Sequence, residues 1–195
     1  MIQRATERAL AAGGSLRASL DMVERIRPHV SAPIVIFSYA NPLLRMGVAE
    51  FARRAAGAGV DGVLALDLPI EEADAFRATL SASDLDTIFL LSPTTTDALY
   101  GISRLGVTGA RDCVASGAEA LVRRIRAQTT MPIALGFGIS RPEHVAEVGA
   151  YADAAVVGSA LVSLIAEEHT SMRLLDTVEA YVRWLKSPCV EAERR

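Results

Sequence analysis

The stretch Pro132-Ile-Ala-Leu-Gly-Phe-Gly-Ile-Ser140 joins an apolar run to a glycine-rich turn, and Asp153-Ala-Ala-Val-Val-Gly-Ser-Ala160 repeats this pattern one segment later. Apolar runs that alternate with helical segments are typical of parallel strands covered by helices. Because ligands of parallel α/β proteins bind at the carboxyl ends of strands, these two turns predict a phosphate site. Glycine lets the backbone approach an anion, and Ser159 adds a hydroxyl donor before a helix predicted over 160–166. The alternative is that these glycines only form turns.

The same alternation of strands and helices runs along the rest of the chain. The strands that the apolar runs predict are residues 33–38, 60–66, 87–91, 99–103, 132–136 and 153–157. Apolar residues at helical spacing predict helices over 48–58, 71–80, 117–127, 142–148, 160–166 and 171–186. An earlier helix starts at Leu16 with Ser15 as its N-cap and ends before Pro28. The pattern is that of an α/β protein.

Composition limits the class of protein. The chain has 195 residues, 51% of them apolar, and a formal net charge of -3. These values predict one soluble domain over residues 1–186, with a disordered tail at 187–195. The apolar runs are too short to span a membrane, so a cytoplasmic location is expected.

Metal, disulfide and nucleic-acid functions find no support in the sequence. The two cysteines and three histidines lie far apart, at Cys113, Cys189, His29, His144 and His169. Their spacing matches neither a zinc site nor a disulfide framework. An isoelectric point of about 5.7 and only 5% aromatic residues argue against a nucleic-acid surface. No metal, nucleic acid or membrane is therefore expected as a partner.

Seven motifs follow one another along the chain. They are Ile2-Gln-Arg-Ala5, Tyr39-Ala-Asn-Pro42, Asp61-Gly-Val-Leu64, Asp67-Leu-Pro69, Ser103-Arg-Leu-Gly-Val-Thr-Gly-Ala110, Gly136-Phe-Gly-Ile139 and Gly158-Ser-Ala160. In this order and at these separations, they resemble the alpha chain of tryptophan synthase. The motif that begins at Ser103 is highly specific for that family, and the resemblance covers nearly the whole chain.

The resemblance implies both a fold and an activity. Members of the family are (β/α)8 TIM barrels that cleave indole-3-glycerol phosphate to indole and glyceraldehyde 3-phosphate. They act in complex with a beta chain, which holds pyridoxal phosphate. The resemblance therefore implies a carbon–carbon lyase of tryptophan biosynthesis that has a beta chain as its partner and no cofactor of its own.

The resemblance also assigns roles to residues at matching positions. Those implied to hold the substrate phosphate are Gly109, Gly138, Gly158 and Ser159, and those implied to line the indole pocket are Phe37, Leu64, Tyr100 and Phe137. The loop 104–110, anchored by Thr108, would close over the substrate, and the surface around Asn41 and Pro69 would face the beta chain. The alternatives are ordinary core positions for Phe37, Leu64 and Tyr100, and a plain turn at Asn41-Pro42.

The chain departs from the family pattern at two places. The family's catalytic Glu and Asp lie on a strand and a loop that come before the first residues of this sequence, so both carboxylates are expected to be absent. Only residues 92–98 separate the third and fourth predicted strands, although a parallel crossover needs about a dozen residues. A helix is therefore expected to be missing there, with the strand 99–103 displaced. The expected fold is an incomplete barrel of about six strands.

Three functions remain open at this point. The first is a tryptophan synthase alpha chain, and the second is a remnant of it that binds phosphate or the beta chain without catalysis. The third is another phosphate-binding barrel enzyme, which the motif at Ser103 disfavours. Among the carboxylates present, Asp67 is the best placed to replace the absent pair, because it follows the strand 60–66. A structural role for Asp67, as an acceptor for loop N–H groups beside Pro69, is favoured.

Overall fold

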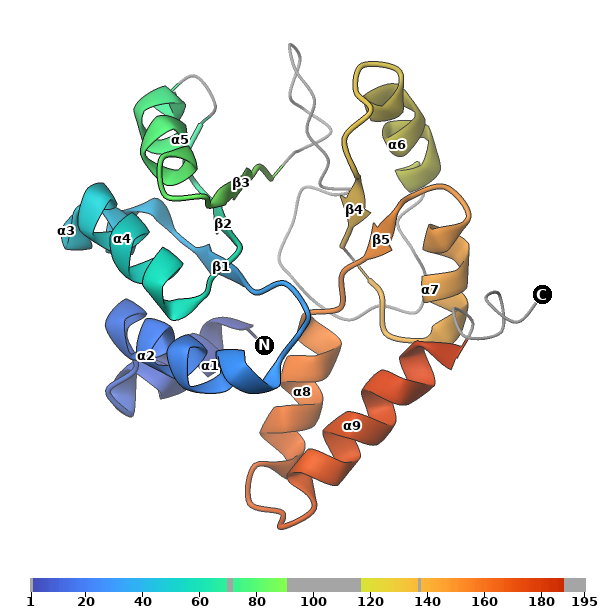
Figure 1. Cartoon of the computed structure of the whole chain (residues 1–195). Coiled ribbons are helices and arrows are strands. Elements are labelled where there is room, and N and C mark those ends of the chain that lie inside the picture. Colours follow the sequence, from blue (N-terminus) through green and yellow to red (C-terminus); the bar gives the residue numbers. More distant parts are fainter. Residues whose placement is uncertain (1, 70–71, 91–116, 137, 188–195) are drawn as a thin grey trace. The chain divides into compact units, whose positions relative to one another are not determined.

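The computed structural model describes residues 2–69, 72–90, 117–136 and 138–187 (Figure 1). The chain divides into two compact units, one of Ala9–Leu90 and one of Met1–Arg8 with Leu91–Arg195. The first helix, α1 (Ile2–Ala11), has no buried residue, and the sequence predicts no element at that place. The strand expected at 99–103, with its displacement, and all but the first residue of the expected tail lie outside the described residues. The single domain expected over 1–186 stays a prediction.

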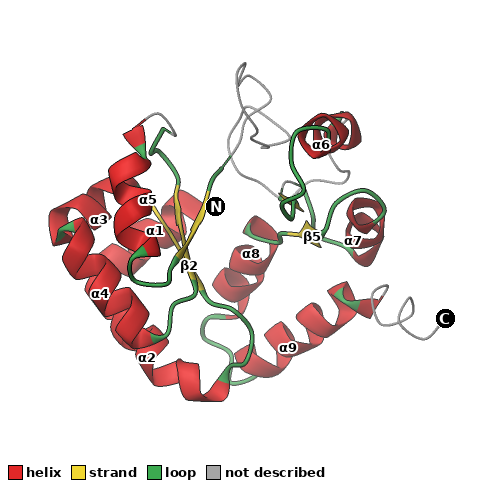
Figure 2. Ribbon diagram, turned by 45° about the horizontal axis from the view of Figure 1, so that its top comes forward, coloured by secondary structure: helices red, strands yellow, loops and turns green. Residues whose placement is uncertain are grey.

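The unit Ala9–Leu90 is built on a parallel sheet in the order β1-β2-β3. Its strands are β1 (Val35–Ser38), β2 (Gly62–Ala65) and β3 (Asp86–Ile88), which are shorter than the apolar runs that predict them. The helices are α2 (Leu16–Ile26), the short 3-10 helix η1 (Arg27–His29), α3 (Ala40–Met46), α4 (Val48–Ala58) and α5 (Asp74–Ser81). Figure 2 shows α3, α4 and α5 on one side of the sheet.

The core of this unit lies between the helices and that face of the sheet. Its fully buried side chains include Leu20, Leu43, Phe51, Val63 and Leu80. Along β1, Ile36 is buried whereas Val35 and Phe37 are exposed, as the alternation of side chains along a strand requires.

The helix boundaries confirm most of the local sequence signals. Ser15 caps α2, because its Oγ accepts a hydrogen bond from the N–H of Ala18 at 3.2 Å, and α2 ends before Pro28 as predicted. The start predicted for the helix 71–80 is wrong. Glu72 donates its N–H to the Pro69 carbonyl in a turn, so α5 begins only at Asp74.

The plain-turn alternative for Asn41-Pro42 is also wrong, because both residues lie in the first turn of α3. Proline is tolerated there, since the first N–H groups of a helix have no partner within the helix. A helix at this place could therefore have been considered from the sequence.

The second unit carries a two-stranded parallel sheet of β4 (Ala134–Leu135) and β5 (Ala154–Ala155). Its helices are α6 (Ala118–Arg126), α7 (Pro142–Gly149), α8 (Ser159–Glu168) and α9 (Leu174–Leu185). Each corresponds to a predicted helix, with boundaries shifted by a few residues. The core contains Ala118, Val122, Leu135, Ile139 and Val148. Both described sheets are parallel, which confirms the α/β class.

An arginine–aspartate clamp joins neighbouring segments in the first unit. The Oδ2 of Asp61 accepts hydrogen bonds from the Ile34 N–H at 2.7 Å and from the Arg27 guanidinium at 2.9 Å. In return, the Asp61 N–H donates to the Ile34 carbonyl at 2.9 Å. The clamp therefore fixes β2 against β1 at the amino ends of the two strands.

The same clamp recurs in the second unit. The Oδ2 of Asp153 accepts from the Ile133 N–H at 2.7 Å and from the Arg126 guanidinium, and the Asp153 N–H donates to the Ile133 carbonyl at 3.0 Å. The spacing from arginine to Pro-Ile is identical in the two units, since Arg126 precedes Pro132 as Arg27 precedes Pro33. The same arrangement thus sets the register of neighbouring strands within each sheet.

Replacing Asp153 by asparagine should remove an acid-dependent part of the stability. The Ile133 N–H, followed by the Arg126 guanidinium, lowers the pKa of the Asp153 carboxyl below its usual value. Such a group stabilises the fold above its unfolded pKa of about 3.9, and the contribution is lost as the pH falls through the lower folded pKa. We therefore expect Asp153→Asn to melt a few degrees below the unchanged chain at pH 7.

The difference in melting temperature should shrink below about pH 4, where the unchanged chain also becomes protonated. Melting curves recorded across this pH range measure the effect. Asp86→Asn is the control, because the Asp86 carboxylate makes no hydrogen bond in the part of the chain that the structure describes. An equal gap at all pH values would contradict a role for the charge.

Candidate functional site

The carboxyl ends of β4 and β5 lie close together. A Cβ on Gly136 would lie 2.8 Å from the Cβ of Val156, which is too close for any side chain at position 136. Gly138 then adopts a φ of 75°, a left-handed conformation that favours glycine. Gly138 and Gly158 each lie three residues beyond the last residue of their strand. In the first turn, close packing therefore requires glycine at position 136 and the backbone conformation favours glycine at 138, whereas a Cβ on Gly158 of the second turn would meet nothing within 4 Å.

The start of α8 presents N–H groups suited to an anion. Gly158 is the N-cap residue and Ser159 the first helical residue, and neither N–H is bonded to any group among the described residues. Gly158 is exposed and Ser159 half-buried. The N–H groups of a first helical turn have no partner within the helix, and the helix dipole favours a negative charge there. The start of α8 therefore carries two backbone donors without a partner among the described residues.

Four of the predicted substrate-binding residues lie outside the described residues. They are Tyr100, Thr108, Gly109 and Phe137, together with the loop 104–110. Their roles stay predictions.

Phe37 and Leu64 lie side by side on neighbouring strands. The register pairs Phe37 of β1 with Leu64 of β2, and Leu64 with Ile88 of β3. Phe37 is 63% exposed, whereas Ile36 beside it belongs to the core. Phe37 is therefore not an ordinary core residue of its unit, and this apolar row could meet an aromatic ring. Ile88 of β3 is the third residue of this row. Because side chains alternate along a strand, the sequence Thr87-Ile88 could have placed Ile88 on this face.

The two residues expected to face a partner lie on segments that a hydrogen bond joins. The Oδ1 of Asp67 accepts the N–H of Ala40 at 2.6 Å, which ties the loop before Pro69 to the first turn of α3, next to Asn41. Asp67 thus has the structural role favoured for it, although the N–H comes from α3. Tyr39 and Leu44 flank this turn and are 59% and 58% exposed. Tyr39 begins the motif that ends at Pro42, whereas Leu44 lies outside it, and the resemblance assigned neither to the partner surface.

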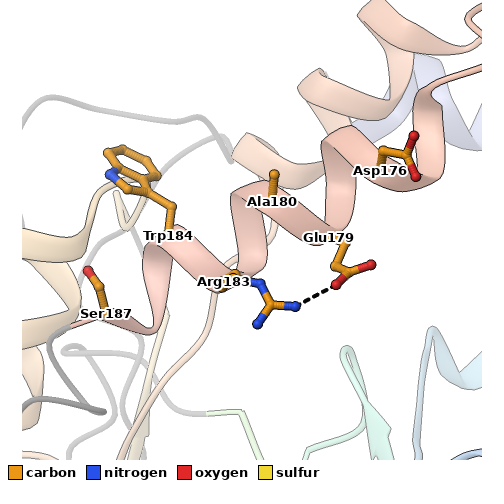
Figure 3. A pocket seen from close by; sticks show the side chains of 6 residues that line it. All are labelled: Asp176, Glu179, Ala180, Arg183, Trp184 and Ser187. Carbon is orange, nitrogen blue, oxygen red and sulfur yellow. Dashed lines mark hydrogen bonds and ion pairs between the residues drawn. The ribbon is translucent and has the colours of Figure 1, made fainter.

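An open hollow of ≈ 500 Å³ follows one side of α9 (Figure 3). Its lining residues are Asp176, Glu179, Ala180, Arg183, Trp184 and Ser187. The guanidinium of Arg183 is paired with Glu179 at 2.6 Å, and Asp176 adds a second carboxylate to the lining. A phosphate would meet net negative charge in this hollow, so it does not compete with the start of α8 as an anion site.

The described residues contain neither a metal-ligating cluster nor a helix that could span a membrane. In the described ranges, no three His, Cys, Asp or Glu side chains come together in a way that could hold a metal ion. Within the same ranges, none of the helices combines the length and apolar character that crossing a membrane demands.

The family model of the tryptophan synthase alpha chain matches residues 1–188. The chain belongs to this family. It is 42% identical to the tryptophan synthase alpha chain of Solibacter usitatus and 45% identical to that of Geobacter sulfurreducens. In each case 95% of this chain aligns with 74% of the relative.

Solved structures agree with the family. The chain matches the tryptophan synthase alpha chain of Legionella pneumophila with a TM-score of 0.80 and 33% identity, over 95% of this chain and 72% of that one. It also matches a structure of the tryptophan synthase a2b2 complex from Pyrococcus furiosus with a TM-score of 0.79 and 34% identity, over 95% and 78%. The fold is that of the TIM-barrel family, of which the described residues supply five parallel strands.

Membership favours the first of the three functions considered. The chain is of the tryptophan synthase alpha type, which makes it a lyase of tryptophan biosynthesis by family. The alignment with the Solibacter relative runs over 198 residues, although it uses only 95% of this 195-residue chain. The aligned span of that relative therefore contains positions with no counterpart in this chain, and the helix expected to be missing after residues 92–98 stays a prediction.

Proposed function

We propose that this chain binds indole-3-glycerol phosphate through the carboxyl ends of β4 and β5 and acts on it together with a tryptophan synthase beta chain. The observation that carries the proposal is the pair of N–H groups at Gly158 and Ser159. They are available at the positive end of α8, and Gly138 ends the neighbouring turn. A phosphate oxygen is the acceptor that best matches such donors.

Cleavage of the substrate requires more than phosphate binding. An acid must protonate the indole ring carbon, and a base must take a proton from the glycerol hydroxyl. The described residues contribute binding, and the family resemblance gives Phe37 and Leu64, which pair on β1 and β2, the role of lining the indole pocket. In this proposal the chain needs no cofactor, because pyridoxal phosphate belongs to the beta chain.

The partner surface is proposed to include Asn41 and Pro69. Asp67 joins their two segments, and the exposed Tyr39 and Leu44 supply apolar area next to Asn41. Exposed aromatic and aliphatic side chains of this kind are typical of the centre of protein interfaces. The Pyrococcus furiosus relative forms an a2b2 complex, which supports assembly with a beta chain. A cytoplasmic location is part of the same proposal.

The substitution Ser159→Asp tests whether the start of α8 binds a phosphate or is only the first turn of a helix. A carboxylate in the first turn of a helix normally stabilises that helix by about 0.3–1 kcal/mol. The same charge should repel a bound phosphate and weaken its binding roughly a hundredfold or more. We therefore expect the variant to melt at or above the temperature of the unchanged chain while it loses affinity for indole-3-glycerol phosphate, measured by calorimetric titration.

Ser171→Asp is the matched control, because it places the same charge just before α9 in the same unit. It should leave the affinity for the substrate unchanged. Equal affinity in the Ser159→Asp variant would place the phosphate elsewhere and overturn the proposal.

A further inference from the structure

The backbone N–H and the backbone carbonyl of Ser140 are both hydrogen-bonded to side chains. Its N–H donates to the Nδ1 of His144 at 3.3 Å, and its carbonyl oxygen accepts from the hydroxyl of Tyr181 at 3.0 Å. His144 lies on α7, and Tyr181 lies on α9, which packs against α7 (Figure 1). Side chains from two helices thus hydrogen-bond to the backbone of one residue in the loop that follows β4.

His144 is unusual among the described residues, because it is the one buried residue with a polar side chain, at 6% exposure. Neutral histidine has one donor and one acceptor nitrogen, so accepting the Ser140 N–H requires Nδ1 to be the acceptor. The N-cap residue of α7, Arg141, makes no side-chain capping bond. His144 therefore reaches back to the chain before the helix, as the glutamate of a capping box does.

Tyr181 makes the second hydrogen bond, from its hydroxyl to the Ser140 carbonyl oxygen. Burial raises the pKa of its hydroxyl, so the group stays protonated and able to donate at neutral pH. The ring of Trp184 lies 5.8 Å from that of Tyr181, centroid to centroid, and supports its orientation. The hydroxyl is half-buried, where a hydrogen bond is less exposed to competition from water.

Ser140 matters because of the two residues before it. Ile139 is 3% exposed and packs into the core of the unit, and Gly138 precedes it with its positive φ. The burial of Ile139 and the two hydrogen bonds of Ser140 hold the backbone that directly follows Gly138. A donor whose direction is fixed in advance binds an anion without a further entropy cost.

We propose that His144 and Tyr181 are positioning residues that fix residues 138–140 for phosphate binding. The inference rests on the proposed function, which places the substrate phosphate at Gly138, Gly158 and Ser159. Neither side chain touches the phosphate in this arrangement. Each acts through a backbone atom of Ser140.

Three substitutions test the two contacts. His144→Leu removes the acceptor, and Tyr181→Phe removes only the hydroxyl, so each should weaken the binding of inorganic phosphate about three- to tenfold. His144→Asn keeps an acceptor oxygen near the place of Nδ1 and should restore affinity close to that of the unchanged chain. Both His144 variants lose ring contacts and should melt lower. If His144 had only a structural role, the phosphate affinity of both His144 variants would fall together with their melting temperature. A positioning role predicts instead that His144→Asn melts lower but keeps its phosphate affinity.

Tyr151→Phe is the control for the loss of a hydroxyl. Tyr151 packs against the same core, and its hydroxyl makes no hydrogen bond in the described ranges, so phosphate affinity should not change.

The measurement is a titration of the full 195-residue chain with inorganic phosphate, followed by the NMR shifts of its amide groups. Exchange of the Ser140 amide hydrogen with solvent, recorded without phosphate, reports the hydrogen bond from this N–H to His144. It should be faster in His144→Leu. If the unchanged chain shows no saturable shift at Gly158 and Ser159, the proposed phosphate site fails. If it binds phosphate normally and His144→Leu and Tyr181→Phe do as well, the positioning role fails while the site stands.

Discussion

A polypeptide of these 195 residues should release indole from indole-3-glycerol phosphate far more slowly than a family member that carries both catalytic carboxylates. The resemblance places that Glu and Asp on segments with no counterpart among residues 1–195. Each general acid or base contributes typically about 10²- to 10⁴-fold to the rate, so we expect turnover to be lower by several orders of magnitude. Binding of the phosphate should persist, because it depends on other residues.

Indole release should be measured with and without a beta chain. The matched comparison takes from the Solibacter relative both the strands expected before residue 1 and the helix expected after residues 92–98, and it should recover activity. Comparable turnover of the two proteins would mean that a carboxylate of this chain performs the chemistry. Asp67→Asn would then identify it, although Asp67 is already engaged with the Ala40 N–H at 2.6 Å.

Phe51→Ala should destabilise the unit Ala9–Leu90 by about 3–5 kcal/mol. Phe51 is fully buried between α4 and the sheet, and removing its ring leaves a cavity that the surrounding helices cannot fill. Phe37→Ala removes the same ring from a site that is 63% exposed, and it should change the free energy of unfolding far less. Denaturant unfolding measures both variants.

For ligand binding, the order of the two effects should be reversed, with the larger loss at Phe37. Phe37→Ala should weaken the binding of an indole-bearing ligand, because Phe37 is the aromatic member of the exposed row, whereas a folded fraction of Phe51→Ala should bind normally. Equal losses of stability in the two variants would show that Phe37 is a core residue after all.

Local signals in the sequence predicted the elements best where the chain marks its own ends. The helix predicted over 48–58 is reproduced residue for residue as α4, because Gly47 and Gly59 bound it with positive φ values and its apolar residues share one face. Strand limits were less accurate, since the length of a strand depends on its neighbours. The run 132–136 pairs only at Ala134 and Leu135.

Contacts between distant residues were the part that the sequence did not predict. A lone histidine at position 144 and a tyrosine 41 residues from Ser140 form no pattern along the chain. The clamps at Asp61 and Asp153 did leave a trace, because the spacing from Arg27 to Pro33 recurs from Arg126 to Pro132. A comparison of the two halves of the sequence could have found it.

The most direct test of the phosphate site is a crystal structure of the chain with glycerol 3-phosphate, which carries the phosphate end of the substrate. We predict that the phosphate oxygens accept hydrogen bonds from the N–H groups of Gly158 and Ser159, with Gly138 beside them. A phosphate bound at another place, or these N–H groups bonded to carbonyls of the chain itself, would contradict the assignment.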